Sequence, residues 1–311
     1  MFAQLRVLAW MILLSLAAGV GLLVAPASAS TTSSSAPCGS MAGTTPHITH
    51  VIWIWEENHD YTQIIGSSSA PYINALSREC GLASNYRSIS HPSAPNYVGA
   101  VSGLPLKSLP AIDCTTGCRQ AGPSLFAQTD WRAYQETMPK NCDPYNSGLY
   151  AARHNPAIYF KTLTSCGTDD VPYSRLSNAL GAGTLASFTF ITPNLADDMH
   201  DGTISQGDAW LAAQLPKILN SSDYTSGHTA IFITWDEGSG GGAFKGTNCI
   251  TSTSPSCHVP TIVLSPYTPR GTVDSVRLSH YSLLRTAEEL LALPLLGQAA
   301  TATSMRQAFH L

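Results

Sequence analysis

The sequence predicts an α/β fold with a largely parallel central sheet. Short runs of apolar and β-branched residues, at positions 50–55, 187–192, 231–235 and 259–265, alternate along the chain with segments of helical periodicity. The first three of these runs lead into clusters of polar or acidic residues. Apolar runs of this kind are typical of strands that are covered by helices on both faces of a parallel sheet.

The N-terminus has the features of a secretory signal peptide. Arg6 provides the positive charge, residues 7–24 are almost wholly apolar, and Ala27-Ser28-Ala29 is a small-residue cleavage site. The apolar run approaches the length of a membrane span, but the cleavage site favours removal of residues 1–29. We therefore expect a secreted protein with no stable membrane insertion, in which residues 30–45 form a poorly ordered Ser/Thr-rich linker and residues 46–311 a single catalytic domain.

The charge and the cysteines narrow the class of protein. The whole chain carries 16 Lys and Arg against 20 Asp and Glu, a formal charge of −4; residues 1–29 hold one cation and no acid, so the remainder carries −5. This balance argues against a nucleic-acid partner. All eight cysteines come after the signal segment, which suggests up to four disulfides. Cys114–Cys118 and Cys249–Cys257 are the expected local pairs; Cys114 and Cys118 as half of a zinc site lack a second pair at suitable spacing.

Four segments have apolar residues at helical spacing, and we expect helices there. They are residues 70–82, a segment around 123–138, residues 207–219, which Pro216 would kink, and residues 280–293. Alternation of these helices with the strands is the second observation that supports an α/β fold.

Carboxylates stand directly after two of the predicted strands. Glu57 and Asn58 end the first strand, and Asp236 and Glu237 end the strand at 231–235. The carboxyl ends of parallel strands meet at one edge of a sheet, where ligands bind. Buried acids are costly unless a positive charge lies between them, and hard oxygen donors suit Mg²⁺, Ca²⁺ or Mn²⁺. The alternative is an acidic, solvated turn.

The predicted strand at 187–192 leads into a loop with Asp197, Asp198, His200 and Asp201. Acids on both sides favour the protonated form of His200, which makes it a candidate proton donor. His154, in Arg153-His-Asn-Pro156, could donate to an anionic ligand or could simply stabilise a turn.

Ser93 is the candidate nucleophile. Pro92 and Pro95 restrict its backbone, and a helix could start at Pro95. The free N–H groups at a helix N-terminus bind anions such as phosphate. The alternative for this segment is a turn with a helix cap. The glycine-rich run at 238–242 is interpreted as a flexible loop, because no Gly-Lys-Ser/Thr comes after it.

Six motifs together resemble the bacterial phosphoesterase family, which contains phospholipases C and certain acid phosphatases within the alkaline phosphatase superfamily. They are Trp55-Glu-Glu-Asn58; His91-Pro-Ser-Ala-Pro-Asn-Tyr97 with Ser102-Gly103; Arg153-His-Asn-Pro156; Thr192-Pro-Asn-Leu with Asp198-Met-His-Asp201; Thr234-Trp-Asp-Glu-Gly238; and Ser279-His-Tyr-Ser-Leu-Leu-Arg285. The resemblance extends from about residue 47 to residue 293. It implies a three-layer αβα sandwich of alkaline phosphatase type.

The resemblance also implies the roles of individual residues. One divalent metal ion (Ca, Mg, Mn or Zn) would be held by Glu57, Asn58, the Ser93 hydroxyl, Asp236 and Glu237, with Ser93 as nucleophile. His154 and His200 match histidines that contact phosphate. Asn96 and His280 are further candidates for contact with substrate; His280 could equally be a neighbour of a helix cap.

The expected activity is hydrolysis of a small phosphoester, most simply a phosphomonoester, through a phosphoserine. The sequence departs from the family's phospholipases after Asn58, where His59-Asp-Tyr stands, and it is shorter than they are. The alternatives are a phospholipase C-like phosphodiesterase acting on phospholipid, a serine esterase, and a non-catalytic, metal-stabilised binding protein. Against the serine esterase, this sequence contains no Gly-x-Ser-x-Gly motif.

Overall fold

The computed structural model describes residues 36–239 and 245–311, and these belong to one compact unit, Ser35–Leu311. The predicted signal peptide and residues 240–242 of the glycine-rich run lie outside the described residues. Within them, no helix is both long and apolar enough to cross a bilayer.

A central sheet of eight strands, in the order β5-β4-β6-β1-β7-β8-β2-β9, organises the domain. The strands are β1 His50–Glu56, β2 Gly81–Ala83, β4 Trp131–Gln135, β5 Asp170–Pro172, β6 Phe188–Thr192, β7 Thr229–Trp235, β8 Thr261–Leu264 and β9 Val273–Asp274. β1 runs parallel to both β6 and β7, whereas β8 runs antiparallel to β7 and β2. A separate parallel pair joins β3 Tyr86–Arg87 to β10 Leu278–Ser279. The largely parallel sheet is confirmed.

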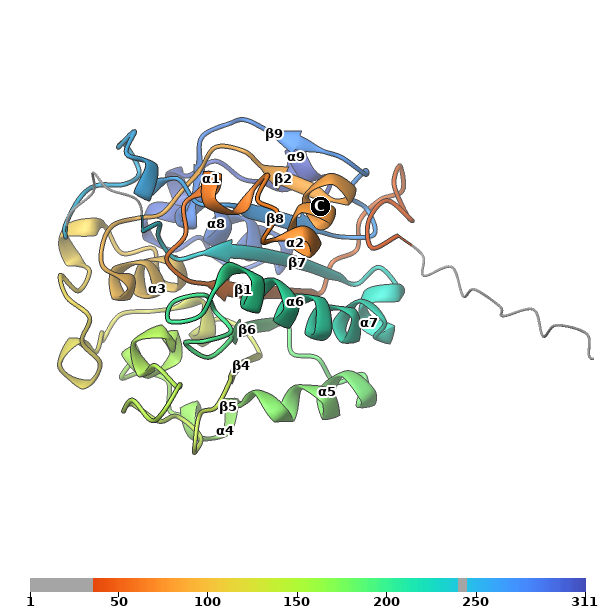
Figure 1. Cartoon of the computed structure of the whole chain (residues 1–311). Helices are drawn as coiled ribbons and strands as arrows, with labels where there is room; N and C mark the ends of the chain where they lie inside the picture. Colours follow the sequence, from red (N-terminus) through yellow and green to blue (C-terminus); the bar gives the residue numbers. More distant parts are fainter. Residues whose placement is uncertain (1–35, 240–244) are drawn as a thin grey trace, which may run out of the picture. The chain divides into compact units, whose positions relative to one another are not determined.

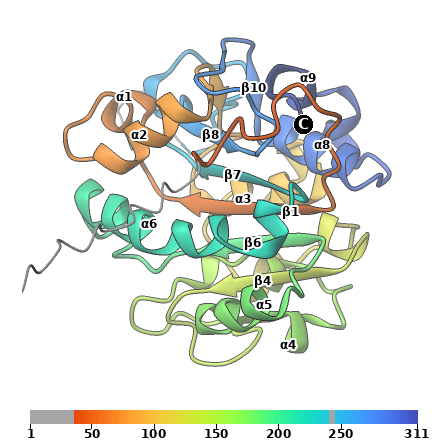
Figure 2. The same ribbon diagram turned by 90° about the vertical axis from the view of Figure 1, so that its right-hand side faces the viewer.

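Helices cover the two faces of this sheet (Figures 1 and 2). The longer ones are α2 Pro71–Glu79, α3 Ser93–Ser102, α5 Leu176–Ala182, α6 Ile204–Leu219 and α8 His280–Leu290; the short ones are α1 Tyr61–Ile64, α4 Cys166–Asp169, α7 Ser222–Thr225 and α9 Arg306–Phe309. α2 packs against α6, and α3 packs against α8. Figure 2 shows α2 and α6 on the opposite side of the sheet from α8, which is the three-layer arrangement that the resemblance implies.

The core is built from the apolar runs of the central strands. Every residue of β6 and β7 is buried, as are the residues of β1 after His50. Trp53 and Trp55 are fully buried and contact aromatic rings of β6 and α3. Burial on both faces explains why β1 and β7 contain continuous apolar runs, while β6 alternates Phe with the buried Thr189.

Four expected elements match helices or strands with shifted ends. α6 begins at Ile204, because the Thr203 side chain accepts a hydrogen bond from the Gln206 N–H and caps the helix. The segment at 70–82 is divided between α2 and β2, and α8 ends at Leu290 rather than at residue 293. α3 starts at Ser93 itself, two residues before the expected start.

The helix expected around 123–138 is wrong. Residues Leu125–Ala127 form a single 3₁₀ turn and Trp131–Gln135 form β4, which lies between β5 and β6. Pairing with β6 satisfies the backbone of this segment, and tertiary pairing overrides a weak helical pattern.

The expected poor order of the linker is also wrong for the part that the structure describes. Cys38 is 1% exposed and forms a disulfide with Cys80 at the end of α2. The Met41 N–H donates to the Pro266 carbonyl at 2.8 Å. The ordered domain therefore starts before residue 46.

Four disulfides connect the eight cysteines. The expected pairs Cys114–Cys118 and Cys249–Cys257 are both present, and they are joined by Cys38–Cys80 and Cys142–Cys166. The Cys114–Cys118 disulfide uses both thiols that a zinc half-site would need.

Candidate functional site

The acidic residues at the ends of the three central strands meet at one edge of the sheet. The neighbouring order β6-β1-β7 places Glu57 and Asn58 between the Asp198 loop and Asp236. The Glu57 N–H donates to the Asp198 carbonyl at 2.8 Å, and the Asn58 N–H donates to Asp236 Oδ1 at 3.3 Å. The expected meeting of the strand ends is therefore present in the fold.

The Glu57 carboxylate lies at the centre of this group and is fully buried. Its Oε2 accepts hydrogen bonds from the Ser93 hydroxyl at 3.3 Å and from Asn58 Nδ2 at 3.2 Å. Its Oε1 accepts a short hydrogen bond from the Tyr97 hydroxyl and lies 3.3 Å from His154 Nε2. One carboxylate thus links the candidate nucleophile to a candidate phosphate contact.

Asp236 and Glu237 complete the acidic centre. Asp236 Oδ1 accepts from its own neighbour, the Glu237 N–H, at 2.6 Å, while Asp236 Oδ2 is buried and has no partner among the described residues. Glu237 Oε2 lies 2.7 Å from His91 Nδ1 and 3.4 Å from Asn96 Nδ2. The contacts of these acids thus come from hydroxyl, amide and imidazole groups.

Burial raises the pKa of all three carboxyl groups, and repulsion between acids raises the pKa values of Glu57 and Glu237 further. Desolvation is the largest cause in each case: it raises the pKa of Asp236 to about 7 and the pKa values of Glu57 and Glu237 well above their ordinary range, with the Asp236 charge as the next cause for both glutamates. In the described part of the chain, no Lys or Arg forms an ion pair with them. Glu57, Asp236 and Glu237 are thus three buried acids without a Lys or Arg partner among the described residues, and one oxygen of Asp236 has no hydrogen bond there. Oxygen donors of this kind suit a divalent cation.

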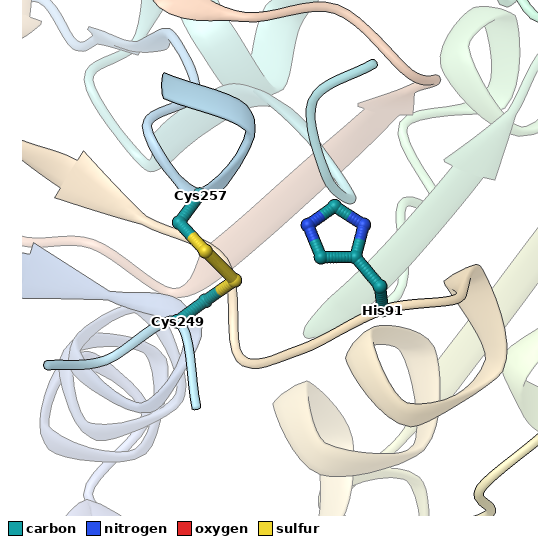
Figure 3. A group of neighbouring side chains, drawn as sticks. All are labelled: His91, Cys249 and Cys257. Carbon is teal, nitrogen blue, oxygen red and sulfur yellow. A yellow bond between two sulfur atoms is a disulfide. The ribbon is translucent and has the colours of Figure 1, made fainter. Parts of the chain in front are cut away.

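Two other groups of metal-ligating residue types have their sulfur atoms committed to disulfides. Figure 3 shows His91 beside the bonded pair Cys249 and Cys257, and the second group contains the bonded pair Cys142 and Cys166. Glu57, His154 and His200 form a third group, whose ligand atoms lie within 4.8 Å of one another.

His154 lies between two carboxylates. Its Nδ1 is 3.3 Å from Asp198 Oδ2, opposite the Nε2 contact with Glu57, and its ring is nearly parallel to that of Tyr97 at 5.5 Å. Burial, followed by the charge of Arg153, lowers the pKa of His154 well below its ordinary value, and burial raises the pKa of Asp198 to about 7. Both shifts favour a neutral imidazole at His154.

His200 contacts a cation as well as the acid that its sequence neighbours provide. Its Nδ1 lies 2.7 Å from Asp201 Oδ1, but its Nε2 lies 3.0 Å from an Arg153 guanidinium nitrogen, which can only donate. His200 Nε2 therefore accepts, and Nδ1 carries the proton. The two histidine rings are 5.5 Å apart, so His200 borders the same centre as His154.

Ser93 occupies the first position of α3 and is 2% exposed. At the next position, the Ala94 N–H donates to Asp113 Oδ1 at 2.9 Å. Asn96 holds the turn before the serine, since its Oδ1 accepts from the Ile89 and Ser90 N–H groups. The structure thus builds this helix start with side-chain hydrogen bonds on both sides of Ser93.

His280 and Asn96, both candidates for substrate contact, are fully buried. His280 Nε2 lies 2.7 Å from the Asp236 carbonyl and Nδ1 lies 3.1 Å from the Tyr86 hydroxyl. Desolvation lowers the pKa of His280 to about 4. In the described structure the two residues support the site from within: Asn96 through the serine turn and His280 through the backbone of Asp236.

Two residues of the site have backbone angles that L side chains seldom adopt. Asn58 has φ 51° and Met199, between Asp198 and His200, has φ 78°. Strained backbone of this kind clusters at functional sites.

The glycine-rich run is held by the backbone at its first residue, since the Gly238 N–H donates to the Ser256 carbonyl at 2.8 Å.

Four residues join the site although the sequence alone assigns them no role: His91, Tyr97, Asp113 and Arg153. His91, Tyr97 and Arg153 stand inside quoted motifs, but their side-chain partners are distant in sequence, so spacing alone carries no signal for those contacts. Asp113 lies in a loop-rich stretch with no motif.

The match to a known family decides between the classes of protein. The model of the family described as "Phosphoesterase family" matches residues 67–294. This chain belongs to the Phosphoesterase family. The matched segment contains Ser93, His154, His200, Asp236 and Glu237, while Glu57 and Asn58 precede it. As a member of this family, the chain is a hydrolase that acts on phosphoric ester bonds.

Individual relatives of this phosphoesterase agree with that class. It is 30% identical over 288 residues to "Phosphatidylinositol-3-phosphatase" of Mycobacterium tuberculosis, covering 91% of this chain and 90% of the relative. It is 26% identical to "Acid phosphatase" of Aspergillus fumigatus, over 79% of this chain and 55% of the relative. The chain thus spans little more than half the length of that fungal relative.

Solved structures agree on the fold. A protein in the alkaline phosphatase superfamily from Vibrio parahaemolyticus superimposes with a TM-score of 0.57 at 12% identity, covering 88% of this chain and 73% of that one. At this identity the likeness concerns the fold alone, and it agrees with the αβα arrangement of the phosphoesterase domain.

Proposed function

We propose that this phosphoesterase is an exported, metal-dependent phosphomonoesterase of acid phosphatase type that works through a phosphoserine at Ser93. The observation that carries the proposal is the hydrogen bond of the Ser93 hydroxyl, at the first turn of α3, to Glu57, whose acidic neighbour Asp236 has an unpartnered buried oxygen. A hydroxyl between buried acids has little use in a carboxyl-ester triad, which needs a histidine base.

Glu57, Asn58, Ser93, Asp236 and Glu237 would hold one divalent cation. Their oxygen donors favour Ca²⁺, Mg²⁺ or Mn²⁺, and Zn²⁺ is a further candidate. When bound, the cation acts as a Lewis acid that lowers the pKa of the serine hydroxyl and offsets negative charge on phosphoryl oxygens.

The side chains then divide the reaction between them. The Ser93 hydroxyl passes its proton towards Glu57 Oε2, its hydrogen-bond acceptor, as its oxygen attacks phosphorus. The bond from phosphorus to the leaving alcohol breaks, and the alcohol oxygen takes a proton. His200 is the proposed donor, and it fills this role in its imidazolium form, in which Nε2 carries a proton instead of accepting from Arg153 as it does in this structure. His154 and Arg153 are placed to bind the phosphoryl oxygens. Water then hydrolyses the phosphoserine in the reverse sense.

The names of the relatives favour a monoester as substrate. A phosphatidylinositol-3-phosphatase and an acid phosphatase are both named as phosphatases, enzymes that cleave phosphomonoesters. A phosphoinositide headgroup, and hence a phospholipid, is a candidate substrate besides small soluble monoesters. A phospholipase C-like diesterase is the second candidate, and it rests on the motifs shared with that branch of the family.

Export is supported by the disulfides. Four of them occur within the described residues, and such bonds form and persist in oxidising compartments. Together with the signal peptide that the sequence predicts at residues 1–29, they support a secreted enzyme.

A comparison of three ester types tests the proposal. A chromogenic phosphomonoester, its matched phosphodiester and a carboxyl ester are offered to wild type and Ser93→Ala, before and after EDTA and with metal added back. We expect cleavage of the monoester that EDTA abolishes and metal restores, and a loss of at least about 10³-fold in kcat for Ser93→Ala.

The other outcomes are equally informative. A preference for the diester selects the phospholipase C-like alternative. Carboxyl-ester cleavage that EDTA leaves untouched rejects the metal site, and turnover by Ser93→Ala at the wild-type rate rejects the nucleophile. A stable protein without any turnover, whose melting temperature falls with EDTA, selects the binding protein.

A further inference from the structure

Asp113 presents a negative charge where a phosphate is expected. Its Oδ1 accepts the Ala94 N–H at 2.9 Å, directly after Ser93 at the start of α3. Pro95 has no N–H, so Ser93 and Ala94 supply the first two backbone donors of this ten-residue helix. A carboxylate therefore already occupies one of these two donors.

The surroundings identify this helix start as the place for a ligand. The fully buried Asp236 has an oxygen without a partner in the described structure, and the buried His154 Nε2, 3.3 Å from Glu57 Oε1, makes no hydrogen bond there. Both residues border Glu57, the carboxylate that accepts the hydrogen bond of the Ser93 hydroxyl. They point to a ligand centred there, independently of the helix end itself.

Asp113 faces that centre from the outer side. Its charge acts on Glu237, His154 and Tyr159, which belong to three different segments of the chain. The residue is exposed and lies in a stretch of short 3₁₀ turns, immediately before the Cys114–Cys118 disulfide.

From these contacts we infer that Asp113 sets the affinity of the site for phosphate groups: its carboxylate takes the position of the phosphate in the resting enzyme, and phosphate or a phosphomonoester binds by displacing it. This inference rests on the proposed function. The carboxylate thereby weakens the binding of inorganic phosphate, the product, as well as that of substrate. An intramolecular competitor of this kind limits product inhibition without taking part in the chemical step.

Substitution by asparagine separates this role from a helix cap. The side-chain oxygen of Asn can accept the hydrogen bond from the Ala94 N–H as the Asp113 carboxylate does, whereas Ala has no acceptor. Asp113→Asn therefore keeps this hydrogen bond and removes the charge, and Asp113→Ala removes both. Asp130→Asn is the control, because Asp130 is an exposed acid just before β4, at the other end of the strand from the site, and its loss changes the net charge by the same amount.

The experiment measures inorganic phosphate binding to metal-loaded enzyme in two ways: as competitive inhibition of phosphomonoester cleavage, and as the rise in melting temperature that phosphate causes. For Asp113→Asn we expect the Ki of phosphate and the KM of the monoester to fall about tenfold, with kcat within about twofold of wild type. Asp113→Ala should show the same tightening with a lower melting temperature without phosphate, and Asp130→Asn should match wild type.

Unchanged or weaker phosphate binding in both Asp113 variants overturns the inference. So does a fall in kcat at constant KM, because it would place Asp113 in the chemical step, and so does an equal tightening in Asp130→Asn, which would make the effect one of net charge. Failure of the proposed function appears separately, as a wild type that neither hydrolyses monoesters nor binds phosphate.

Discussion

The Tyr97 side chain contacts both the Glu57 carboxylate and the His154 ring. Its hydroxyl donates to Glu57 Oε1, and its ring lies nearly parallel to His154 and 4.9 Å from Trp55. With Oε1 held in this way, Oε2 of Glu57 is the oxygen that faces Ser93. The tyrosine is fully buried, so its hydroxyl has no competing contact with solvent.

Tyr97→Phe removes this hydroxyl and retains the ring. We expect a fall of about tenfold or more in kcat/KM and a weaker affinity for added metal, because Glu57 loses the group that fixes its orientation. Steady-state kinetics and calorimetric metal titration measure the two effects. Tyr224→Phe is the matched control: it removes a buried hydroxyl that donates to the Pro37 carbonyl, away from the site. Equal losses in both variants would reduce the role of Tyr97 to general packing.

Among single residues, the sequence predicts that the side chains standing directly after a strand belong to the site. Glu57, Asn58, Asp236 and Glu237 come immediately after apolar runs, so the strand order alone brings them together. The contacts of Tyr97 and Asp113 depend on how α3 and the loop at 106–118 pack, and no local pattern encodes this. The proton on His200 is a further example, since Arg153 rather than the adjacent acids determines it.

Helix α3 is fixed at its far end as firmly as at Ser93. Its C-cap, Gly103, has φ 66°, and a Cβ there would collide with the Leu296 carbonyl oxygen. The Gln298 N–H donates to the Gly103 carbonyl at 2.7 Å. The position of Ser93 along the sheet therefore depends on a contact at the opposite end of the helix.

Gly103→Ala tests this dependence. A left-handed backbone and a clash with rigid backbone atoms should lower the free energy of unfolding by about 2 kcal/mol or more and reduce kcat. Chemical denaturation and kinetics check both effects. Gly122→Ala is the control, since a Cβ there has nothing within 4 Å. A Gly103→Ala enzyme as stable as the control would contradict the predicted strain.

Among the elements, the sequence predicts those whose burial shapes their composition. β1, β6 and β7 consist largely of apolar and β-branched residues, and these runs predict their ends to within two residues. The pattern around β4 wrongly predicts a helix, and β2, β5 and β9 have only two or three residues each, so their strand character exists only through their partners. Such short strands contain too few residues for an apolar periodicity to be recognised.

For the molecule as a whole, burial of acids makes stability depend on pH. Asp170, at the start of β5, is fully buried; its Oδ2 accepts from Asn155, and its Oδ1 has no partner among the described residues. Desolvation raises its pKa from 3.8 to about 8. Between those values the folded protein holds a proton that the unfolded chain releases, so this contribution to stability is complete below pH 3.8 and is lost as the pH rises towards 8.

Asp170→Asn removes this titration and retains an oxygen for Asn155. The free energy of unfolding of the variant, minus that of wild type, should increase from about pH 5 to about pH 7.5 by up to about 1.4 kcal/mol per pH unit. Urea denaturation of both proteins at several pH values measures the difference, in which the other acids cancel. A difference that is independent of pH would mean that Asp170 titrates normally in the folded protein.

The disulfides illustrate the limit of sequence at this scale. The pairs four and eight residues apart, Cys114–Cys118 and Cys249–Cys257, are predicted by proximity. Cys38–Cys80 and Cys142–Cys166 span 42 and 24 residues, and only the packed fold selects them from the remaining combinations.

The reversed direction of β8 has a consequence for how this enzyme can diverge. Because β7 and β8 are antiparallel neighbours, the segment joining them leaves and re-enters the sheet at the edge where Glu237 lies. We expect that a longer or shorter connection would change the surroundings of Glu237 and leave the register between β7 and β8 intact. New substrate preferences could therefore arise there by insertion, while the catalytic scaffold folds as before.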